Sequence, residues 1–547
     1  MQFGVGLAVL LLLAGVLGSV RLASLPPDEH EVLVLRTVEE MAARGDWVVP
    51  YFNAAPRLNK PPMSYWATAL VAAADDAATR VRPWHGRAVS LAAGLAMAVL
   101  AAFMARRLFG DAAHALAAAA LTVTTAGWFS YTHDARPDML YAFFCTAGFA
   151  AYVAARAGGG RLRTAPCLLM WACYGLATLT KGPQLPAMLL LASAVTQLRA
   201  GGGWRALGAL CWLRGIALLV AIALPWWLLL QARLSAGVVE ESQLAGTLLR
   251  PGFEHLFNGY YLYRPLQLLL PWLPVVPAAW LAAWVAARRD KRAAAGAAQD
   301  AADAPGAVAL LTLAFAVPAM ILSLGPQQRF FYMLPALVPM CVLAARGLVL
   351  LGRRRPRTVL GLLLAQGLVV AVAAGWVGWS GWTAGRTGDA GWLLVAALAG
   401  IGGARWMRSD RPARVFVVVI VLAAGTFAIA ARQGLLWSDD RRHTYALGSA
   451  LGDIVADAAP LYAYRLTPAV YVYASNRSIP RLADPPALQA ALARAREPLW
   501  VLMETREAKA VATLGQLEPV HLMPVGAPDR SGLYRLSAPE KPPGEEK

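Results

Sequence analysis

Charged residues and cysteines are both scarce in this chain of 547 residues. Only 15% of the residues are charged, whereas 58% are hydrophobic, a composition far more apolar than that of a soluble domain. The five cysteines all lie in apolar stretches, and none has CxxC spacing, which argues against a disulfide framework and against a cysteine-bound metal. The composition therefore excludes an ordinary soluble protein, and most of the chain is expected to lie in lipid.

Acidic residues are fewer than basic ones, 32 against 50, which gives a formal net charge of +18. A large basic excess is a common feature of nucleic-acid-binding proteins. Here, however, the basic residues stand in short clusters between apolar segments, where the positive-inside rule places them on the cytoplasmic side of a membrane. We therefore expect membrane lipids around the chain and no nucleic-acid partner.

Apolar runs recur between Phe3 and Ala431, and a spanning helix needs about 20 such residues. With the first helix oriented N-inside, the basic clusters at 106–107, 288–292 and 353–357 fall on one side, provided that the short segment Met63–Ala74 is an interfacial helix. This alternation predicts a polytopic α-helical membrane protein with about 13 transmembrane helices. The expected spans include 112–130, 137–155, 164–180, 215–231, 266–286, 390–404 and 415–431.

Two domains are expected. Residues 1–436 would form the transmembrane catalytic domain, with outer loops at about 26–84, carrying interfacial helices, and at about 232–264. Residues 437–547 are more polar and predict a small C-terminal α/β domain on the periplasmic face. Within this tail the pattern favours strands at 461–465, 470–474, 499–503 and 520–525, and helices at 484–495 and 504–514.

Polar residues gather at helix ends on the predicted outer side. That side follows from the basic clusters of the inner loops alone, so the gathering of polar residues is an independent observation. Ionisable residues next to membrane helices are costly, which makes a functional role the first hypothesis. Carboxylates act as general bases or metal ligands, and Lys and Arg stabilise phosphate charge. The set comprises Asp28, Glu29, Glu31, Asn59, Lys60, Asp134, Arg136, Asp138, Lys181, Glu254, His255, Gln328 and Arg329.

Each of these residues also has a simpler interpretation. Asp28 stands where an N-cap would begin the next helix, and Asp138 follows a Pro at the first turn of another, where the helix dipole favours an acid. His255 alone is typical of an ordinary loop histidine. Long basic side chains at helix ends also snorkel to the membrane interface, which applies to Lys60, Lys181 and Arg329.

The stretch PPDEHEVLVLRTVEEMAARGDWVVPYFNAAPRLNKPPMSYW, residues 26–66, resembles the first outer loop of the bacterial aminoarabinose transferases. It also resembles the wider group of dolichyl-phosphate-mannose protein mannosyltransferase-like enzymes, the GT-C glycosyltransferases. Further matches follow in family order: ARPDML (135–140), LTKGP (179–183), HLFNGYYLYRPLQLLLPWLP (255–274) and QQRFFYMLPALVP (327–339). The resemblance implies a GT-C fold with an outer C-terminal domain, in the bacterial inner membrane.

The resemblance also implies roles for individual residues. Asp28 and Asp138 match acids linked to catalysis or acceptor contact. The donor phosphate would be held by Lys60, Arg329, Tyr332 and Lys181. Candidate substrate or metal contacts are Glu29, Asn59, Asp134 and His255. No cofactor is certain, and a divalent metal stays open.

This sequence differs from the family pattern at three positions that affect the roles implied above. Asn59, Gln243 and Glu31 stand where aminoarabinose transferases often carry Glu, His and Arg, which argues against a zinc site of the family type and weakens lipid A as the acceptor. The resemblance implies an inverting transfer of a sugar from polyprenyl phosphate to a lipid or other envelope acceptor at the periplasmic face. The alternatives are a protein O-mannosyltransferase-like enzyme, with a protein acceptor, and a transporter of polyprenyl lipids or solutes.

Overall fold

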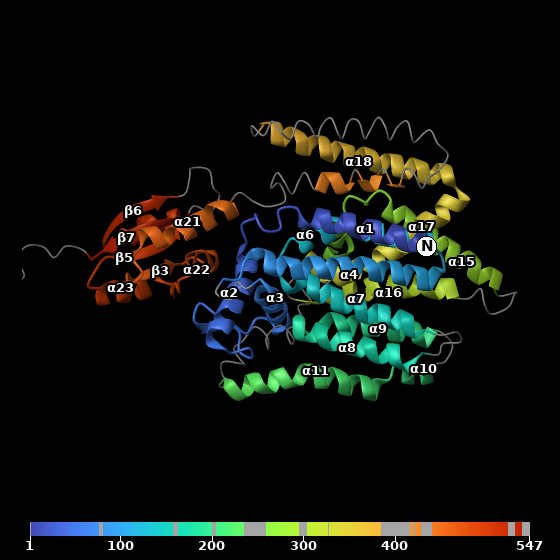
Figure 1. Cartoon of the computed structure of the whole chain (residues 1–547), viewed down its shortest axis with the longest axis horizontal. Helices are drawn as coiled ribbons and strands as arrows, with labels where there is room; N and C mark the ends of the chain where they lie inside the picture. Colours follow the sequence, from blue (N-terminus) through green and yellow to red (C-terminus); the bar gives the residue numbers. More distant parts are fainter. Residues whose placement is uncertain are drawn as a thin grey trace, which may run out of the picture. The chain divides into compact units, whose positions relative to one another are not determined.

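The computed structural model describes residues 2–75, 80–156, 162–199, 204–234, 259–294, 303–325, 328–383, parts of 416–427, 440–522 and 531–538. These residues form two compact units (Figure 1). The first unit contains Met1–Leu22, Leu58–Val71 and Trp84–Leu435. The second contains Ala23–Arg57, Ala72–Pro83 and Leu436–Lys547. The segments 23–57 and 72–83 thus group with the tail, whereas the sequence division assigned the whole first loop to the 1–436 domain.

The first unit is a bundle of helices, which confirms the prediction of a polytopic helical membrane protein. Among the described residues, seven helices are long and apolar enough to cross a membrane, or up to eight if a bent pair counts as one span. The helices of the bundle are α1 (Gln2–Ser19), α3 (Met63–Ala74), α4 (Pro83–Phe109), α5 (Ala112–Val123), α6 (Ala126–Thr132), α7 (Pro137–Ala155), α8 (Thr164–Thr180), α9 (Gln184–Gln197), α10 (Arg205–Gly208), α11 (Trp212–Arg233), α14 (Tyr260–Tyr263), η4 (Arg264–Leu269), α15 (Val276–Ala294), α16 (Asp303–Leu322), η6 (Phe330–Ala336), α17 (Leu337–Arg354) and α18 (Pro356–Thr383).

Several expected helices are confirmed, with α7 and α8 matching the predicted bounds. The span expected at 112–130 is instead two helices, α5 and α6, with a bend of 56° between them. The bend follows a run of threonines: Thr124 Oγ1 donates to Ala120 O at 2.6 Å, and Thr125 caps α6. Ala126 N then donates to Leu270 O at 2.6 Å. Hydroxyls that bond to nearby backbone offer an alternative to the continuing helical ladder.

The helix expected at 266–286 begins later than predicted, at Val276. The preceding sequence contains Pro271 and Pro274, and proline has no N–H for the helical ladder. Residues 264–269 form the 3-10 helix η4 instead. The span expected at 390–404 lies outside the described residues, as do residues 235–258 of the long outer loop. Of the span expected at 415–431, residues 416, 417, 419–421 and 423–427 are described and are helical, and the others lie outside the described residues. The total of 13 spans therefore stays a prediction.

The basic helix ends lie together at one end of the bundle. Arg107 Nη2, at the end of α4, donates to Arg156 O, just after α7, at 2.6 Å. Arg353, at the end of α17, pairs with Asp111, which caps the start of α5. Asp138 stands in the first turn of α7, a helix length away from Arg156. The polar site residues of α7 therefore lie at the opposite end of that helix from the basic cluster.

The second unit is an α/β layer structure. Its elements are α2 (Glu29–Arg44), β1 (Tyr51–Phe52), β2 (Ala55–Pro56), α21 (Asp440–Ile454), β3 (Leu461–Tyr464), α22 (Ala469–Ser475), β4 (Arg481–Leu482), α23 (Pro485–Arg494), β5 (Leu499–Glu504), η8 (Thr505–Glu507), α24 (Ala508–Val511), β6 (Gln516–Leu522) and β7 (Ser531–Ser537). The tail strands form one sheet in the order β4-β3-β5-β7-β6, with β3 parallel to β4 and β5. Helices α21 and α22 share one apolar core with this sheet, and α23 and α24 share the other.

The tail predictions are confirmed for the strands at 461–465 and 499–503 and for the helix at 484–495. Of the strand expected at 520–525, residues 520–522 belong to β6, which begins at Gln516, and residues 523–525 lie outside the described residues. The strand expected at 470–474 is wrong, because these residues form helix α22. The five residues from Ala469 to Tyr473 are all buried. The periodicity of a short apolar run without a polar face does not distinguish a helix from a strand. The helix expected at 504–514 is only the two short turns η8 and α24.

Candidate active site

A buried carboxylate forms the centre of the polar cluster in the first unit. Asp138 follows Pro137 in the first turn of α7 and is only 5% exposed. Lys181 Nζ lies 2.5 Å from its Oδ1, and Arg136 Nε lies 3.3 Å from its Oδ2. Arg136 also reaches Asp134 through Nη1, at 3.6 Å. A buried carboxylate needs such partners, because an unpaired charge in a low-dielectric site is strongly unfavourable.

The turn between α8 and α9 places Lys181. Lys181 is the C-cap residue of α8, and Gly182 follows with φ of 126°, a conformation that favours glycine. Tyr141, one helical turn after Asp138 on α7, donates its hydroxyl to Gly182 O at 3.0 Å and accepts from Leu185 N at 3.2 Å. One side chain of α7 therefore fixes the turn whose lysine reaches the neighbouring Asp138.

Aromatic rings of η6 pack against the two cations. The Lys181 ammonium lies 4.7 Å from the Tyr332 ring centre and 5.2 Å from that of Phe331. The Arg136 guanidinium lies 4.8 Å from the same Phe331 ring. These are distances at which ring faces attract cations. The rings thus hold the cations in place while leaving their polar atoms directed at oxygen acceptors.

The segment before η6 is held by tyrosines of α14. Tyr261 accepts from Arg329 N at 3.1 Å and donates to Arg329 O at 3.2 Å. Tyr260 accepts from Phe330 N at 3.1 Å. The Arg329 backbone is therefore fixed while its side chain is exposed, which leaves the guanidinium accessible to an anion.

A cavity of about 360 Å³ lies next to Lys181. Lys60 and Asn59 line it together with apolar residues of α11, a helix that packs against α8 (Figure 1). A cavity with apolar walls and two lysines suits an amphiphile with an anionic head. Its lining residues are Asn59, Lys60, Pro61, Thr178, Leu179, Lys181, Gly182, Pro183, Gln184, Leu219, Val220, Ala223, Leu224, Trp226 and Trp227.

Asp28 and Glu29 belong to the second unit, at the start of α2. Asp28 Oδ1 accepts from Glu31 N at 2.8 Å, and Glu31 Oε2 accepts from Asp28 N at 3.0 Å. This reciprocal pair is a capping box, so the simpler interpretation of Asp28 as an N-cap is confirmed. The box also fixes the Asp28 side chain to the helix that follows. Glu29 is exposed.

The structure brings most of the predicted residues of the first unit into one region. Asp134, Asp138 and Lys181 are linked through contacts with each other or with Arg136. Tyr332 lies against Lys181, and Asn59 and Lys60 share its cavity. His255 lies outside the described residues.

Sequence analysis did not predict two residues that support the site, Tyr141 and Phe331. It included Arg136 among the polar residues but gave it no role. Tyr141 had a signal: it stands three residues after Asp138, and such residues share a helix face. Phe331 had none, since its contact with Arg136 joins segments distant in the chain.

Comparisons with known proteins identify proteins that are similar to this chain in sequence and in fold. Residues 3–236 match the family described as dolichyl-phosphate-mannose-protein mannosyltransferase. The chain is 29% identical over 345 residues to the undecaprenyl phosphate-alpha-4-amino-4-deoxy-L-arabinose arabinosyl transferase of Pseudomonas aeruginosa, covering 59% of this chain and 55% of that relative. A transferase of the same name from Sodalis glossinidius is 27% identical over 348 residues, covering 58% and 54%. The chain thus matches about half the length of these curated relatives.

The fold is similar along nearly the whole chain to a solved structure. ArnT from Cupriavidus metallidurans bound to undecaprenyl phosphate superposes with a TM-score of 0.72 at 20% identity, covering 98% of this chain and 99% of that one. Its apo state gives a TM-score of 0.70. At this identity the likeness establishes the fold, while the sequence matches above point to the same group. The chain therefore has the fold of this solved ArnT structure, which is the GT-C fold that the motifs of the first outer loop predict.

Proposed function

We propose that the chain is an inverting glycosyltransferase that moves a sugar from a polyprenyl-phosphate donor to a lipid or other envelope acceptor. The observation that carries this proposal is the cluster of Asp138, Lys181 and Arg136 beside the cavity that Lys60 and α11 line. Anionic groups bind where several cations converge, and long apolar chains bind along apolar helix faces. A lipid-linked sugar phosphate combines both features in one molecule.

The donor phosphate would lie at the lysines of the cavity. Lys60 and Lys181 would contact its oxygens, with Arg329 and the Tyr332 hydroxyl completing the donor site, and the prenyl chain would follow the apolar residues of α11. The relatives named above act on undecaprenyl-phosphate-linked sugar, and the solved neighbour holds undecaprenyl phosphate. Both facts support a donor of the same chemical class here.

The reaction would be a single displacement at the anomeric carbon. The acceptor hydroxyl loses its proton to a carboxylate, its oxygen forms the new glycosidic bond, and the bond between the anomeric carbon and the phosphate oxygen breaks. The carrier leaves as polyprenyl phosphate, and Lys and Arg stabilise the charge that it gains. Attack from the side opposite to the leaving group inverts the configuration of the sugar.

The two acids suit different tasks in this scheme. Asp138 already holds two cations, so its proposed task is to orient Lys181 and Arg136 toward the phosphate. Asp28, which matches the first acid of the family motif, is the proposed base for the acceptor. Glu29, Asn59, Asp134 and His255 are the proposed substrate contacts.

The proposed location is the bacterial inner membrane, with the active site and the C-terminus in the periplasm. The basic helix ends that meet near Arg107, Arg156 and Arg353 would face the cytoplasm. Asp138 and Lys181 would then face the periplasm.

The test is transfer of radiolabelled sugar from a panel of polyprenyl phosphates to membrane extracts. Wild type is compared with Asp28→Asn and Lys60→Ala, and with Lys509→Ala as a control, because Lys509 is exposed on α24. We expect label in a lipid fraction with wild type and the control, and a loss of about 10²-fold or more with the two site variants.

Other outcomes separate the alternatives. Label that enters protein instead of lipid would favour the protein mannosyltransferase-like reaction, which the family match at residues 3–236 also allows. A product with retained configuration would refute the single displacement. Normal binding of polyprenyl phosphate without transfer from any donor would overturn the enzyme proposal and favour a transporter.

A further inference from the structure

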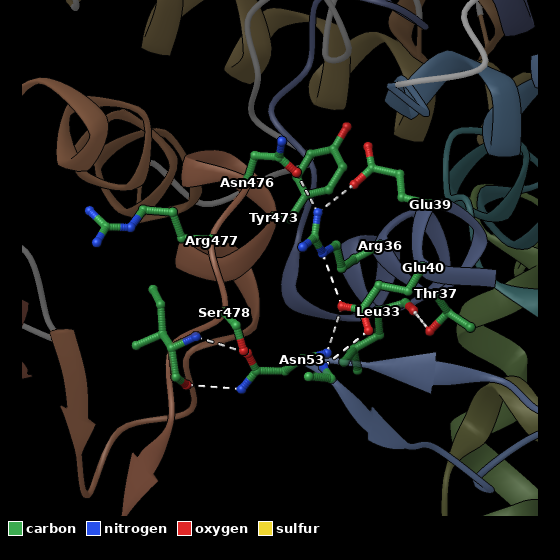
Figure 2. Close-up of polar contacts among 12 residues, drawn as sticks. Leu33, Arg36, Thr37, Glu39, Glu40, Asn53, Tyr473, Asn476, Arg477 and Ser478 are labelled. Atoms are coloured by element: carbon green, nitrogen blue, oxygen red, sulfur yellow. Dashed lines mark hydrogen bonds and ion pairs between the residues drawn. The ribbon is translucent and has the colours of Figure 1, made fainter. Parts of the chain in front are cut away.

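A buried polar cluster joins helix α2 to the C-terminal segment inside the second unit (Figure 2). Glu39 and Glu40 of α2 are only 7% and 8% exposed. Arg36, one turn earlier, pairs with Glu39 at 3.2 Å and with Glu40 at 3.1 Å. Arg36 also donates to the Asn476 side chain, in the tail. Two buried acids and one shared arginine are costly to assemble unless each charge is paired, and both acids have further partners in the second unit.

Glu40 holds the turn of the β1–β2 hairpin. Both turn residues, Asn53 and Ala54, have positive φ, of 56° and 65°, as a two-residue type I′ turn requires. Glu40 Oε1 accepts from Asn53 N at 2.8 Å, and Glu40 Oε2 accepts from Ala54 N at 3.0 Å. The carboxylate of α2 therefore fixes the backbone of a turn that Ala54 disfavours.

Asn53 in turn binds the tail backbone. Its Nδ2 donates to Ile479 O at 2.9 Å, and its Oδ1 accepts from Ile479 N at 2.8 Å. The Ser478 hydroxyl donates to the same Oδ1 at 2.8 Å. One amide thus pairs with both backbone groups of Ile479, as a neighbouring strand would, and Phe52 of the hairpin packs against the tail core that contains Ile479.

A second attachment runs through Glu39. Glu39 Oε1 accepts from Val81 N at 3.0 Å, and Val81 O accepts from the Tyr473 hydroxyl at 2.7 Å. Arg80 donates to Tyr473 O at 2.8 Å, and its guanidinium lies 4.7 Å from the Tyr473 ring centre. Glu39 and Glu40 therefore both reach the tail, each through a different segment of the first loop.

We infer that Asn53 and Glu40 are positioning residues: through them the C-terminal segment sets the position of α2 and of Asp28 at its start. This inference rests on the proposed function, in which Asp28 is the base. The capping box ties Asp28 to α2, and an α-helix is a stiff element that rises 1.5 Å per residue. Asp28 and Glu40 are twelve residues apart, about 18 Å along the axis, so a shift at one end of the helix is carried to the other.

In this scheme the tail positions α2 and does not bind the acceptor. The tail and the first-loop segments 23–57 and 72–83 form one compact unit. The tail would therefore act on catalysis by holding α2, with no residue of its own touching the substrate. Such support matters for catalysis, because a displacement of a catalytic group by about 1 Å lowers the rate by about 10²-fold.

The test compares Asn53→Gly and Asn53→Asp with wild type, as full-length protein in lipid nanodiscs. Gly keeps the positive φ and removes all three side-chain bonds. Asp also tolerates positive φ and keeps the two bonds that Asn53 accepts, but loses the one that it donates to Ile479 O. The control is Gln489→Ala, which removes an amide from an exposed position of α23. The readouts are hydrogen exchange of residues 29–44, kcat and KM for transfer, and binding of undecaprenyl phosphate.

We expect Asn53→Gly to raise the exchange rate in residues 29–44 by about tenfold or more and to lower kcat by about tenfold or more. KM for the donor and undecaprenyl phosphate binding should change less than about twofold, because the cavity residues belong to the first unit and distant sites act independently. Asn53→Asp should fall between wild type and Asn53→Gly, and Gln489→Ala should match wild type.

Three outcomes would count against the inference. Unchanged exchange in residues 29–44 would show that the tail does not hold α2. Faster exchange with unchanged kcat would remove the link to catalysis. A parallel loss of undecaprenyl phosphate binding would point to general misfolding. If wild type transfers no sugar at all, the proposed function fails, while the exchange comparison still decides whether the tail holds the helix.

Discussion

Lys181 Nζ lies 2.5 Å from Asp138 Oδ1, and Arg136 Nε approaches the other oxygen of the same carboxylate at 3.3 Å. The three residues come from the start of α7 and the end of α8. Arg136 also reaches Asp134 at 3.6 Å, and Lys60 lines the cavity next to Lys181 as a third cation. That arrangement fits a site that receives a phosphate, with the acid fixing the direction of both cations.

Replacing Lys181 by Met should lower kcat by about 10²-fold or more, because one cation that stabilises the leaving phosphate is lost. Lys181→Arg should keep part of the rate, since it keeps the charge but changes the geometry. Transfer kinetics of both variants measure this. Equal rates for Lys181→Met and wild type would show that the lysine only anchors the end of α8.

Tyr141→Phe should lower the transfer rate by about tenfold, which corresponds to a loss of about 1.4 kcal/mol. The variant removes the bond to Gly182 O and the acceptor for Leu185 N, so the turn that carries Lys181 loosens. The helix itself should persist, because Phe fills the same volume. Circular dichroism of the purified protein controls for folding, and an unchanged rate would remove Tyr141 from the site.

The sequence predicted the helical membrane class and the region where the polar residues meet. Both follow from long apolar runs and from the sorting of Arg and Lys, which depend on composition more than on packing. Asp138 and Lys181 were found because charge next to an apolar helix is rare and costly. The cation–ring contacts of Phe331 and the two attachments of α2 join segments far apart in the chain, and no local pattern encodes them.

The errors have equally physical causes. Helix α22 is buried on all sides, so its alternating Val and Tyr residues resemble a strand. The bend between α5 and α6 depends on threonine hydroxyls and on Leu270, which accepts from Ala126 N. The grouping of residues 23–57 with the tail depends on side-chain bonds such as those of Asn53 with Ile479.

Filling the cavity should weaken donor binding without altering the chemistry. Ala223→Trp places a large ring among the α11 residues that line it, so KM for a long-chain donor should rise by about tenfold while kcat changes little. Ile216→Trp is the matched control, because Ile216 is an exposed residue of the same helix. A water-soluble donor with a short prenyl chain should be affected less, and equal effects on both donors would argue against a prenyl site here.

Ala54→Gly should stabilise the second unit by about 1 kcal/mol, because Ala54 has φ of 65° and a left-handed conformation costs a residue with a Cβ roughly 1–2 kcal/mol. Gly loses some of this gain through the greater freedom of the unfolded chain. Thermal unfolding of the purified protein measures the change. The matched change Ala43→Gly, at an exposed position near the end of helix α2, should destabilise by a similar amount. A loss of stability with Ala54→Gly would contradict the assignment of strain to the turn.

Glu39 should give the second unit an unusual dependence on pH. Burial raises the pKa of Glu39 above its ordinary 4.5, although Arg80, Arg36 and the Val81 N–H oppose the shift. Between the ordinary and the raised pKa, the folded protein binds more protons at Glu39 than the unfolded chain does. The free energy of unfolding must therefore fall as pH rises through this window, which is the opposite of the usual behaviour of a salt-bridged carboxylate.

Glu39→Gln should remove this component, because the amide has no proton to bind or release in this range and still offers an oxygen to Val81 N. Hydrogen exchange of residues 29–44, followed upward from pH 4.5 and corrected for the intrinsic exchange rate, compares the two proteins. Wild type should lose protection relative to the variant as pH rises, and the difference should level off above the raised pKa. The same change at Glu497, an exposed residue, controls for the loss of a charge. Identical pH profiles for wild type and Glu39→Gln would mean that the arginines hold the Glu39 carboxylate ionised, so that the buried cluster acts as a permanent ion pair.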